Sequence, residues 1–357
     1  MGAATAYLLR GASAPARPML RRALPEWGPA FRRAAELSHR KAPPATLPVP
    51  EVLDRPTTSI EEQRELLLAN MEHVLGLGLD ALKKVRAVLA ASPAASTGSP
   101  WATRHPMSRG ECIERRRSAK LTPADPALCG APNMVALFDP TIQTEKDAES
   151  CIDQYEFPNV PCEYPLVWVT ALEASQLCAA LDKRLCDAHE WEGACAGRLR
   201  PVEEEYTWEG PRIRRSHQHN EARPKIWAYG SEGRDEVCAT GAQKSPGCVA
   251  VTFGRCGSNT SPAGAHPQCV SRLGVYDLHG NVAEHMNLPM TPEELTSRGG
   301  LGQTEMKGSW FAFARHRPHA DDCRWRAPAW HATAVGDARS HANYHLGFRC
   351  CRSVVGR

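Results

Sequence analysis

The segment whose residue types and spacing most clearly suggest chemistry is residues 274–285, GVYDLHGNVAEH. Gly274 and Gly280 mark backbone positions that favour unusual dihedral angles or the close approach of another segment. Asp277 and Glu284 add two carboxylates to a turn that is rich in backbone carbonyls, and oxygens of both kinds are the ligands that calcium prefers. The same spacing also fits a hydrogen-bonded turn with two solvated acids. Calcium binding is therefore a hypothesis that these residues allow without requiring it.

Histidines are concentrated near the end of the chain, at His316, His319, His331, His341 and His345. Imidazole is the commonest protein ligand of iron, copper and zinc. No pair of these histidines has a familiar metal spacing such as H-E-x-x-H, and surface histidines are common. A redox metal, iron or copper, is therefore a hypothesis that this cluster permits but does not support. A serine-hydrolase interpretation lacks its G-x-S-x-G motif.

The chain has 14 cysteines, an even number, which all lie between Cys112 and Cys351. No C-x-x-C pair is present, so a zinc ribbon or a thioredoxin-like site lacks its usual spacing. Disulfides in an oxidising compartment are the natural expectation for such a set. We therefore expect an extracytoplasmic protein, periplasmic or secreted, although the first residues contain no clear secretion signal. One long loop region is expected to be closed by Cys238, Cys248, Cys256 and Cys269.

Composition limits the classes of function. The chain has 357 residues, 42% of them hydrophobic and 23% charged, which is ordinary for a globular protein. A net charge of +3 is too small to argue for nucleic acid as a partner. No apolar run is long enough for a transmembrane segment.

The chain divides into four expected regions. Residues 1–56, rich in alanine, arginine and proline, predict a disordered or targeting leader. Residues 57–92 predict an amphipathic helix, whose leucine and methionine stripe is expected to pack on the main domain or on a partner. Residues 93–128 are typical of a linker, and residues 129–353 form the main domain.

Two glycines, Gly76 and Gly78, are expected to bend or split the predicted helix.

Several ordered stretches of the main domain resemble the formylglycine-generating enzyme, or sulfatase-modifying factor, family. The segment 274–285 resembles the family's G-[LV]-Y-D-x-x-G-N-V-x-E-W run. The other matching stretches are CIDQYEFPN at 151–159, VWVT at 167–170, KRLCDAHEWE at 183–192, KGSW at 307–310 and LGFRC at 346–350.

The resemblance implies an α+β fold: an irregular, loop-rich, C-type-lectin-like domain held together by disulfides and calcium, with an N-terminal helical appendage. It also implies two disulfides, Cys178–Cys350 and Cys195–Cys323. Each would close a loop of more than a hundred residues and would stabilise the fold by about 4–5 kcal/mol in the chain-entropy model.

The resemblance further implies structural calcium at two places. In the first site, two side chains and two backbone carbonyls supply the oxygens; in the second, an asparagine begins a less well matched ligand set. The implied ligands are Asp277, Gly280, Val282 and Glu284 for the first site, and Asn220 and Glu221 for the second.

The family's oxidase chemistry uses two cysteines shortly after G-G-S-W, which bind copper(I) through soft thiolates. Residues 310–319 contain no cysteine, and the next one, Cys323, is assigned to a disulfide. The copper mechanism is therefore not expected. The remaining catalytic candidates are Trp310, Arg315, His316 and His319. Related sulfoxide synthases bind iron through an H-x-x-x-H-x-E set, whereas the N-terminal helix has only His73.

Two classes of function follow. The interpretation we favour on the sequence is a noncanonical member of the family, an oxidative or maturation enzyme acting on a peptide or a peptide-derived substrate. Pyoverdine-maturation members are similar in lacking the copper cysteines. The alternative is a non-catalytic binding module that recognises a peptide, a glycan or a partner protein. Aromatic side chains expected at the surface would suit such a cleft, although they would equally suit a core: Trp310, Phe311, Phe313, Trp325 and Trp330.

Overall fold

The computed structural model describes residues 51–119, 121, 124, 126–249, 252–297, 302–327 and 333–354. All of these belong to one compact unit that begins at Pro50. The expected leader lies outside the described residues except for residues 51–56, and so do Trp330 and His331.

The N-terminal helical region consists of two helices, α2 (Ile60–Leu75) and α3 (Leu79–Ala91). Ser59 begins α2, and its hydroxyl accepts a hydrogen bond from the backbone N–H of Glu62 at 3.1 Å. Gly76 ends α2 in the left-handed conformation, with φ of 65°, which glycine adopts without steric cost. The single helix predicted over 57–92 is therefore split at the glycines.

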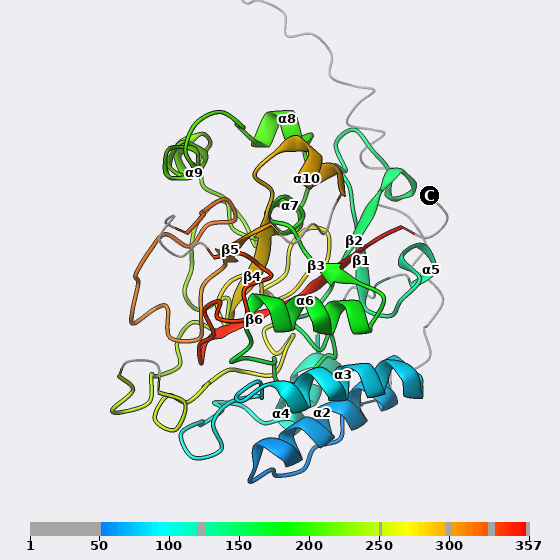
Figure 1. Cartoon of the computed structure of the whole chain (residues 1–357), viewed down its shortest axis with the longest axis vertical. Coiled ribbons are helices and arrows are strands. Elements are labelled where there is room, and N and C mark those ends of the chain that lie inside the picture. Colours follow the sequence, from blue (N-terminus) through cyan, green and yellow to red (C-terminus); the bar gives the residue numbers. More distant parts are fainter. Residues whose placement is uncertain are drawn as a thin grey trace, which may run out of the picture. The chain divides into compact units, whose positions relative to one another are not determined.

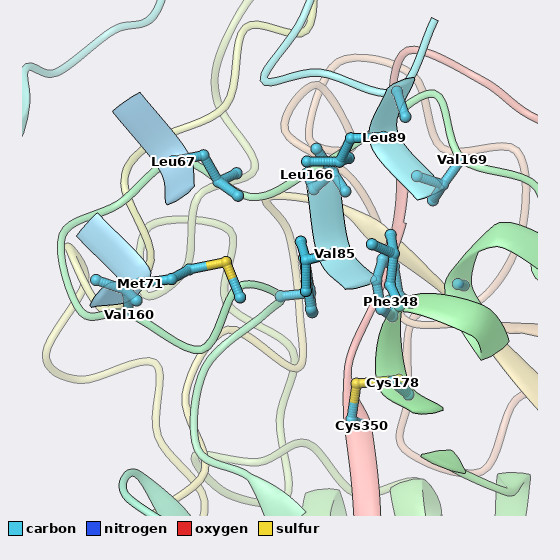
Figure 2. Packing of buried hydrophobic residues seen from close by; sticks show 14 of the residues in the cluster. Leu67, Met71, Val85, Leu89, Val160, Leu166, Val169, Cys178, Phe348 and Cys350 are labelled. Atoms are coloured by element: carbon cyan, nitrogen blue, oxygen red, sulfur yellow. A yellow bond between two sulfur atoms is a disulfide. The ribbon is translucent and has the colours of Figure 1, made fainter. Parts of the chain in front are cut away.

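The apolar faces of α2 and α3 are buried against the main domain (Figure 2). Figure 1 shows both helices on the side of the molecule that carries α6 (Ala171–Ala180). Burying one leucine or valine side chain contributes about 1.5–3 kcal/mol, so this layer stabilises the domain on which it lies. The cluster includes Leu67, Met71, Val85 and Leu89 from the helices, and Val160, Leu166, Val169 and Phe348 from the domain.

The described residues of the expected linker, within 93–128, are folded onto the domain. Helix α4 (Arg109–Arg117) begins with a capping box that Ser108 and Glu111 form. Cys112 on this helix is joined to Cys162 by a disulfide. The neighbouring Arg109 donates to the buried carboxylate of Glu163 at 2.6 Å. These bonds, which composition does not reveal, hold the segment in place.

Two small sheets form the centre of the domain. The first is antiparallel with the order β1-β2-β7-β3, and the second has the order β5-β4-β6, with β4 and β6 parallel. Strands of the first sheet are β1 (Met134–Leu137), β2 (Ser150–Asp153), β3 (Arg184–Leu185) and β7 (Cys350–Ser353). Strands of the second are β4 (Ala283–Leu288), β5 (Gln303–Lys307) and β6 (Leu346–Phe348).

Helices around the sheets are short. Thr170 caps α6, and Asp187 caps α7 (Ala188–Ala196), as aspartate and threonine commonly do at helix N-termini. The others are α5 (Pro126–Cys129), the 3-10 helix η2 (Glu145–Asp147), α8 (Val202–Glu205), α9 (Arg212–Glu221) and α10 (Pro292–Ser297). The fold is thus a mixed α+β domain with an N-terminal helical region.

All 14 cysteines lie in the described residues, and all are paired in seven disulfides. Seven disulfides suggest an oxidising, extracytoplasmic setting. None of the described helices is both long enough and apolar enough to cross a bilayer. Two of the pairs, Cys178–Cys350 and Cys195–Cys323, are those that the resemblance implied. The other five are Cys112–Cys162, Cys129–Cys151, Cys186–Cys351, Cys238–Cys269 and Cys248–Cys256.

The neighbours Cys350 and Cys351 point to opposite faces of β7. Cys350 lies in the core cluster beneath α6, and Cys351 lies in the cluster around Trp191 on α7.

Loop length predicts which disulfides matter most for stability. Cys178–Cys350 spans 172 residues, whereas Cys248–Cys256 spans 8. In the chain-entropy model these loops correspond to about 5 and about 2–3 kcal/mol. Replacing both cysteines of each pair by alanine should therefore lower the free energy of unfolding by about 2 kcal/mol more for the long loop than for the short one. Guanidinium unfolding of the oxidised variants measures this, and equal losses would contradict it.

Candidate functional site

The segment 274–285 packs around a buried arginine, Arg349, which comes from a later part of the chain. The Nε of Arg349 donates to one carboxylate oxygen of Glu284 at 2.7 Å, and its Nη2 donates to the other at 2.6 Å. The three remaining guanidinium protons go to the carbonyls of Asp153, Gln154 and Tyr276, at 3.1, 3.5 and 3.0 Å. Trp191 also donates to Glu284, at 3.1 Å. Arg349 is fully buried. Its bidentate pair with Glu284 uses both carboxylate oxygens.

Two more carboxylates lie near this pair. Asp277 accepts from the backbone N–H of Gly264 at 2.5 Å, and Glu156 accepts from Asn281 Nδ2 at 2.6 Å. Burial raises the pKa of Asp277 to about 6. Burial and the charges of Asp277 and Glu284 raise the pKa of Glu156 well above its usual range. Arg349 balances one charge, and the raised pKa values of Asp277 and Glu156 show that burial works against the ionised form of both carboxyls.

At the first predicted calcium site, both oxygens of Glu284 accept hydrogen bonds from Arg349. Among the described residues, several groups of three potential metal ligands have their ligand atoms within 4.8 Å of one another. Asp277, Glu156 and Glu284 do not form such a group. Gly280 and Val282 lie in the same buried turn. Calcium at this turn stays a prediction, in which the ion would share the carboxylate of Glu284 with Arg349.

The residues of the second predicted calcium site lie at the end of α9. Asn220 exchanges two hydrogen bonds with the backbone of Arg326: its Oδ1 accepts at 2.8 Å and its Nδ2 donates at 3.1 Å. The side chain of Glu221 is 70% exposed and lies 3.7 Å from His217. The structure therefore gives Asn220 a role in holding the segment after Cys323 and leaves Glu221 at the surface.

The segment that follows KGSW turns its aromatic side chains inward. Trp310, Phe311 and Phe313 are all buried, in a cluster with Trp168 and Tyr344. Trp325 is buried as well. Of the two alternatives that the sequence left open, the core position therefore holds for these four residues, and a surface cleft is excluded for them.

The histidine candidates are not brought together. His316 and Arg315 are exposed, whereas His319 is stacked on Trp325 with ring centroids 3.8 Å apart. The His319 Nδ1 lies 2.6 Å from the carbonyl of Ala320, so this nitrogen is a donor rather than a metal ligand. Neither histidine belongs to a cluster of three metal-ligating side chains among the described residues.

The sequence did not reveal a hydrogen-bond network that joins His279, Asp321 and Ser309. His279 Nδ1 lies 3.0 Å from one oxygen of Asp321, and the hydroxyl of Ser309 donates to the other at 2.8 Å. His279 Nε2 accepts from the backbone N–H of Ala228 and lies 3.3 Å from the sulfur of Cys195. Although the three residue types match a hydrolase triad, Ser309 does not contact the histidine. The hydrogen-bond network instead holds the KGSW turn beside the Cys195–Cys323 disulfide.

A cavity of about 400 Å³ lies beside α7 and α8 and the segment that follows α9. Its charged lining comes from residues far apart in the sequence, which explains why no motif revealed it. The cationic residues of the lining are Arg198, Arg200, Arg223, Lys225 and Arg324, and its acidic residues are Glu192 and Glu205.

Glu192, at the base of this cavity, is surrounded by donors. Its Oε1 lies 3.0 Å from Lys307 Nζ and 3.0 Å from Arg326 Nε, and its Oε2 lies 3.0 Å from His219 Nε2. Burial alone would raise the pKa of Glu192, but the charge of Arg326, followed by those of His219 and Lys307, holds it well below its usual range. Glu192 is therefore a carboxylate at neutral pH.

The Arg349 pair predicts a large effect of Glu284→Gln. The change leaves a buried guanidinium without its counter-charge, which typically costs about 3–5 kcal/mol of unfolding free energy. The matched control is Glu65→Gln, whose partner Arg86 and own side chain are about half exposed. Such surface pairs contribute at most about 1 kcal/mol. Urea unfolding of both variants checks this, and similar losses would show that Arg349 does not depend on Glu284.

A second prediction concerns pH and His285 on β4. Its Nε2 donates to the carbonyl of Val169 at 3.0 Å, and burial lowers its pKa from 6.5 to about 4. The unfolded chain therefore binds a proton at higher pH than the folded chain does, so this stability is present above pH 6.5 and is lost as the pH falls towards 4.

Between pH 7 and pH 5, His285 should account for a loss of about 2 kcal/mol. His285→Asn should remove that part of the pH dependence, while His73→Asn, at an exposed position on α2, should not. Unfolding free energies at the two pH values measure the difference. A variant whose profile follows that of the unchanged protein would show that folding does not lower the pKa of His285.

Comparisons with known proteins agree with the motifs. A family model described as the sulfatase-modifying factor enzyme 1-like domain matches residues 141–354. No curated protein matches the chain. A solved structure titled "Crystal Structure of CarF" is similar over 62% of this chain and 97% of that one, with 13% identity and a TM-score of 0.32. Because the family model covers more than half of its residues, the chain belongs to the sulfatase-modifying factor enzyme 1-like family.

Proposed function

We propose that this chain is an extracytoplasmic recognition module, periplasmic or secreted, that uses its disulfide-bonded scaffold to bind a peptide, a glycan or a partner protein. The observation that carries the proposal is the pairing of all 14 cysteines. Copper(I) chemistry of the family's kind needs free thiolates, and a disulfide supplies none.

An oxidative or maturation enzyme, the interpretation favoured on the sequence, would need a redox metal bound by histidine. His316 and His319 lie in the required segment, but neither belongs to a group of three metal-ligating side chains among the described residues. A metal site also needs several ligands at fixed geometry with supporting hydrogen bonds. The geometry of the described residues therefore favours recognition over oxidation.

The scaffold suits recognition because it is rigid beneath its loops. Seven disulfides and the buried Arg349 pair hold long irregular segments in place. Binding to such preorganised loops avoids much of the entropy cost of ordering them. Loops on a fixed scaffold are also where proteins commonly place binding residues.

The test combines thiol, metal and oxygen measurements on the full chain purified from an oxidising compartment. We expect no thiol that reacts after denaturation, and no oxygen uptake above the protein-free rate when iron(II) or copper(I) is supplied with cysteine-containing peptides. Labelled protein should bind saturably to members of a peptide or glycan array.

Oxygen uptake that is lost in a His316→Ala, His319→Ala double variant, but kept in His73→Ala, would overturn the proposal and establish a redox enzyme. Absence of saturable binding on either array would contradict it as well.

A further inference from the structure

The cavity beside α7 and α8 has more positive charge than its carboxylates can balance. Glu192 is bound by Lys307 and Arg326, and Glu205 by Arg324. Arg200 and Arg223 share Glu205 with the half-exposed Glu204, at 3.4–3.8 Å. Once Lys307, Arg326 and Arg324 are paired, four cationic side chains remain. Arg200 and Arg223 have only Glu204 and Glu205 as acidic partners, and the other two are Arg198 and Lys225.

Two of those cations have no acidic partner. Arg198 and Lys225 line the cavity, and neither forms an ion pair within 4 Å in the part of the chain that the structure describes. Around the cavity, seven cationic side chains thus stand against three carboxylates within 4 Å: Arg198, Arg200, Arg223, Lys225, Lys307, Arg324 and Arg326 against Glu192, Glu204 and Glu205.

A buried donor in the lining is also unused. Arg324 is 7% exposed, and its Nε has no acceptor among the described residues. Buried guanidinium protons normally find acceptors. Burial lowers the pKa of Arg324, and although Glu192 raises it, the like charges of Arg326 and Arg200 lower it further. A negative group in the cavity would relieve this repulsion and could accept the unused proton.

A metal ion is the competing interpretation, because Glu192, Glu205 and His219 bring their donor atoms within 4.8 Å of one another. Both carboxylates already bind cationic side chains, and Glu192 is held between Lys307 and Arg326. A cation added here would have to displace an arginine or a lysine, so the charge of the site favours an anion instead.

We propose that this cavity binds an oxyanion, a phosphate, sulfate or carboxylate group of an organic ligand, through Arg198, Arg223 and Arg324. Guanidinium groups match the geometry of these anions and bind them through charge-assisted hydrogen bonds. Ile226 and Ala196 give the cavity an apolar part on which the body of the ligand can lie. The inference names the ligand class for the recognition role proposed above and rests on that role for its biological meaning.

The test titrates the full oxidised chain with inorganic phosphate, sulfate or acetate in a zwitterionic buffer of low ionic strength. Calorimetry should show saturable binding of one anion per chain, and the anion should raise the unfolding temperature as a ligand of the folded state does. The strongest of the three identifies the type of oxyanion. Arg223→Gln and Arg198→Gln should each weaken binding about tenfold, the effect expected for one lost charge-assisted contact.

The matched control is Arg339→Gln, at an arginine that does not line the cavity and whose side chain is 95% exposed. It should bind as the unchanged protein does. Arg324→Gln is kept as a third variant because its pairing with Glu205 makes it sensitive to folding, which circular dichroism monitors. Lack of saturable binding for all three anions, or equal weakening in Arg339→Gln, would overturn the inference. Oxygen uptake in the earlier test would reject the recognition role without affecting this result.

Discussion

The domain depends on the buried ion pair between Arg349 and Glu284. Arg349 lies between β6 and β7, and Glu284 lies on β4, so the pair joins the two sheets. The same guanidinium donates to the carbonyls of Asp153 and Tyr276, which ties the end of β2 and the turn before β4 to one centre. Because all its donors have acceptors, the charge is tolerated inside the fold.

Local patterns predicted the elements that depend on neighbouring residues. Gly76 splits the N-terminal helix as expected, because the effect of a glycine on a helix acts within one helical turn. The resemblance supplied Cys178–Cys350 and the α+β class. The sequence did not reveal that the partner of Glu284 is Arg349, 65 positions away. Side-chain direction was also hidden, so the sequence left open whether aromatics such as Trp310 line a cleft or lie in the core.

The candidate site shows the same limit for charge. Arg198, Arg223 and Arg324 come from separate segments and have no common spacing, so only the folded chain reveals that they line one cavity. Conversely, the five C-terminal histidines are close in sequence, yet the structure brings neither His316 nor His319 into a metal-ligating group of described residues. Closeness in sequence therefore suggested a histidine site that the described residues do not form, and separation in sequence hid the cationic cavity.

The opposite orientations of Cys350 and Cys351 have a consequence for strand register. Successive side chains of a strand face opposite sides of its sheet, so a slip of one residue would exchange the two faces. Cys350 would then face away from Cys178, and Cys351 away from Cys186. Two adjacent bridges to opposite sides thus allow only one alignment of β7 between β2 and β3, and a chain oxidised with the partners exchanged could not form this sheet.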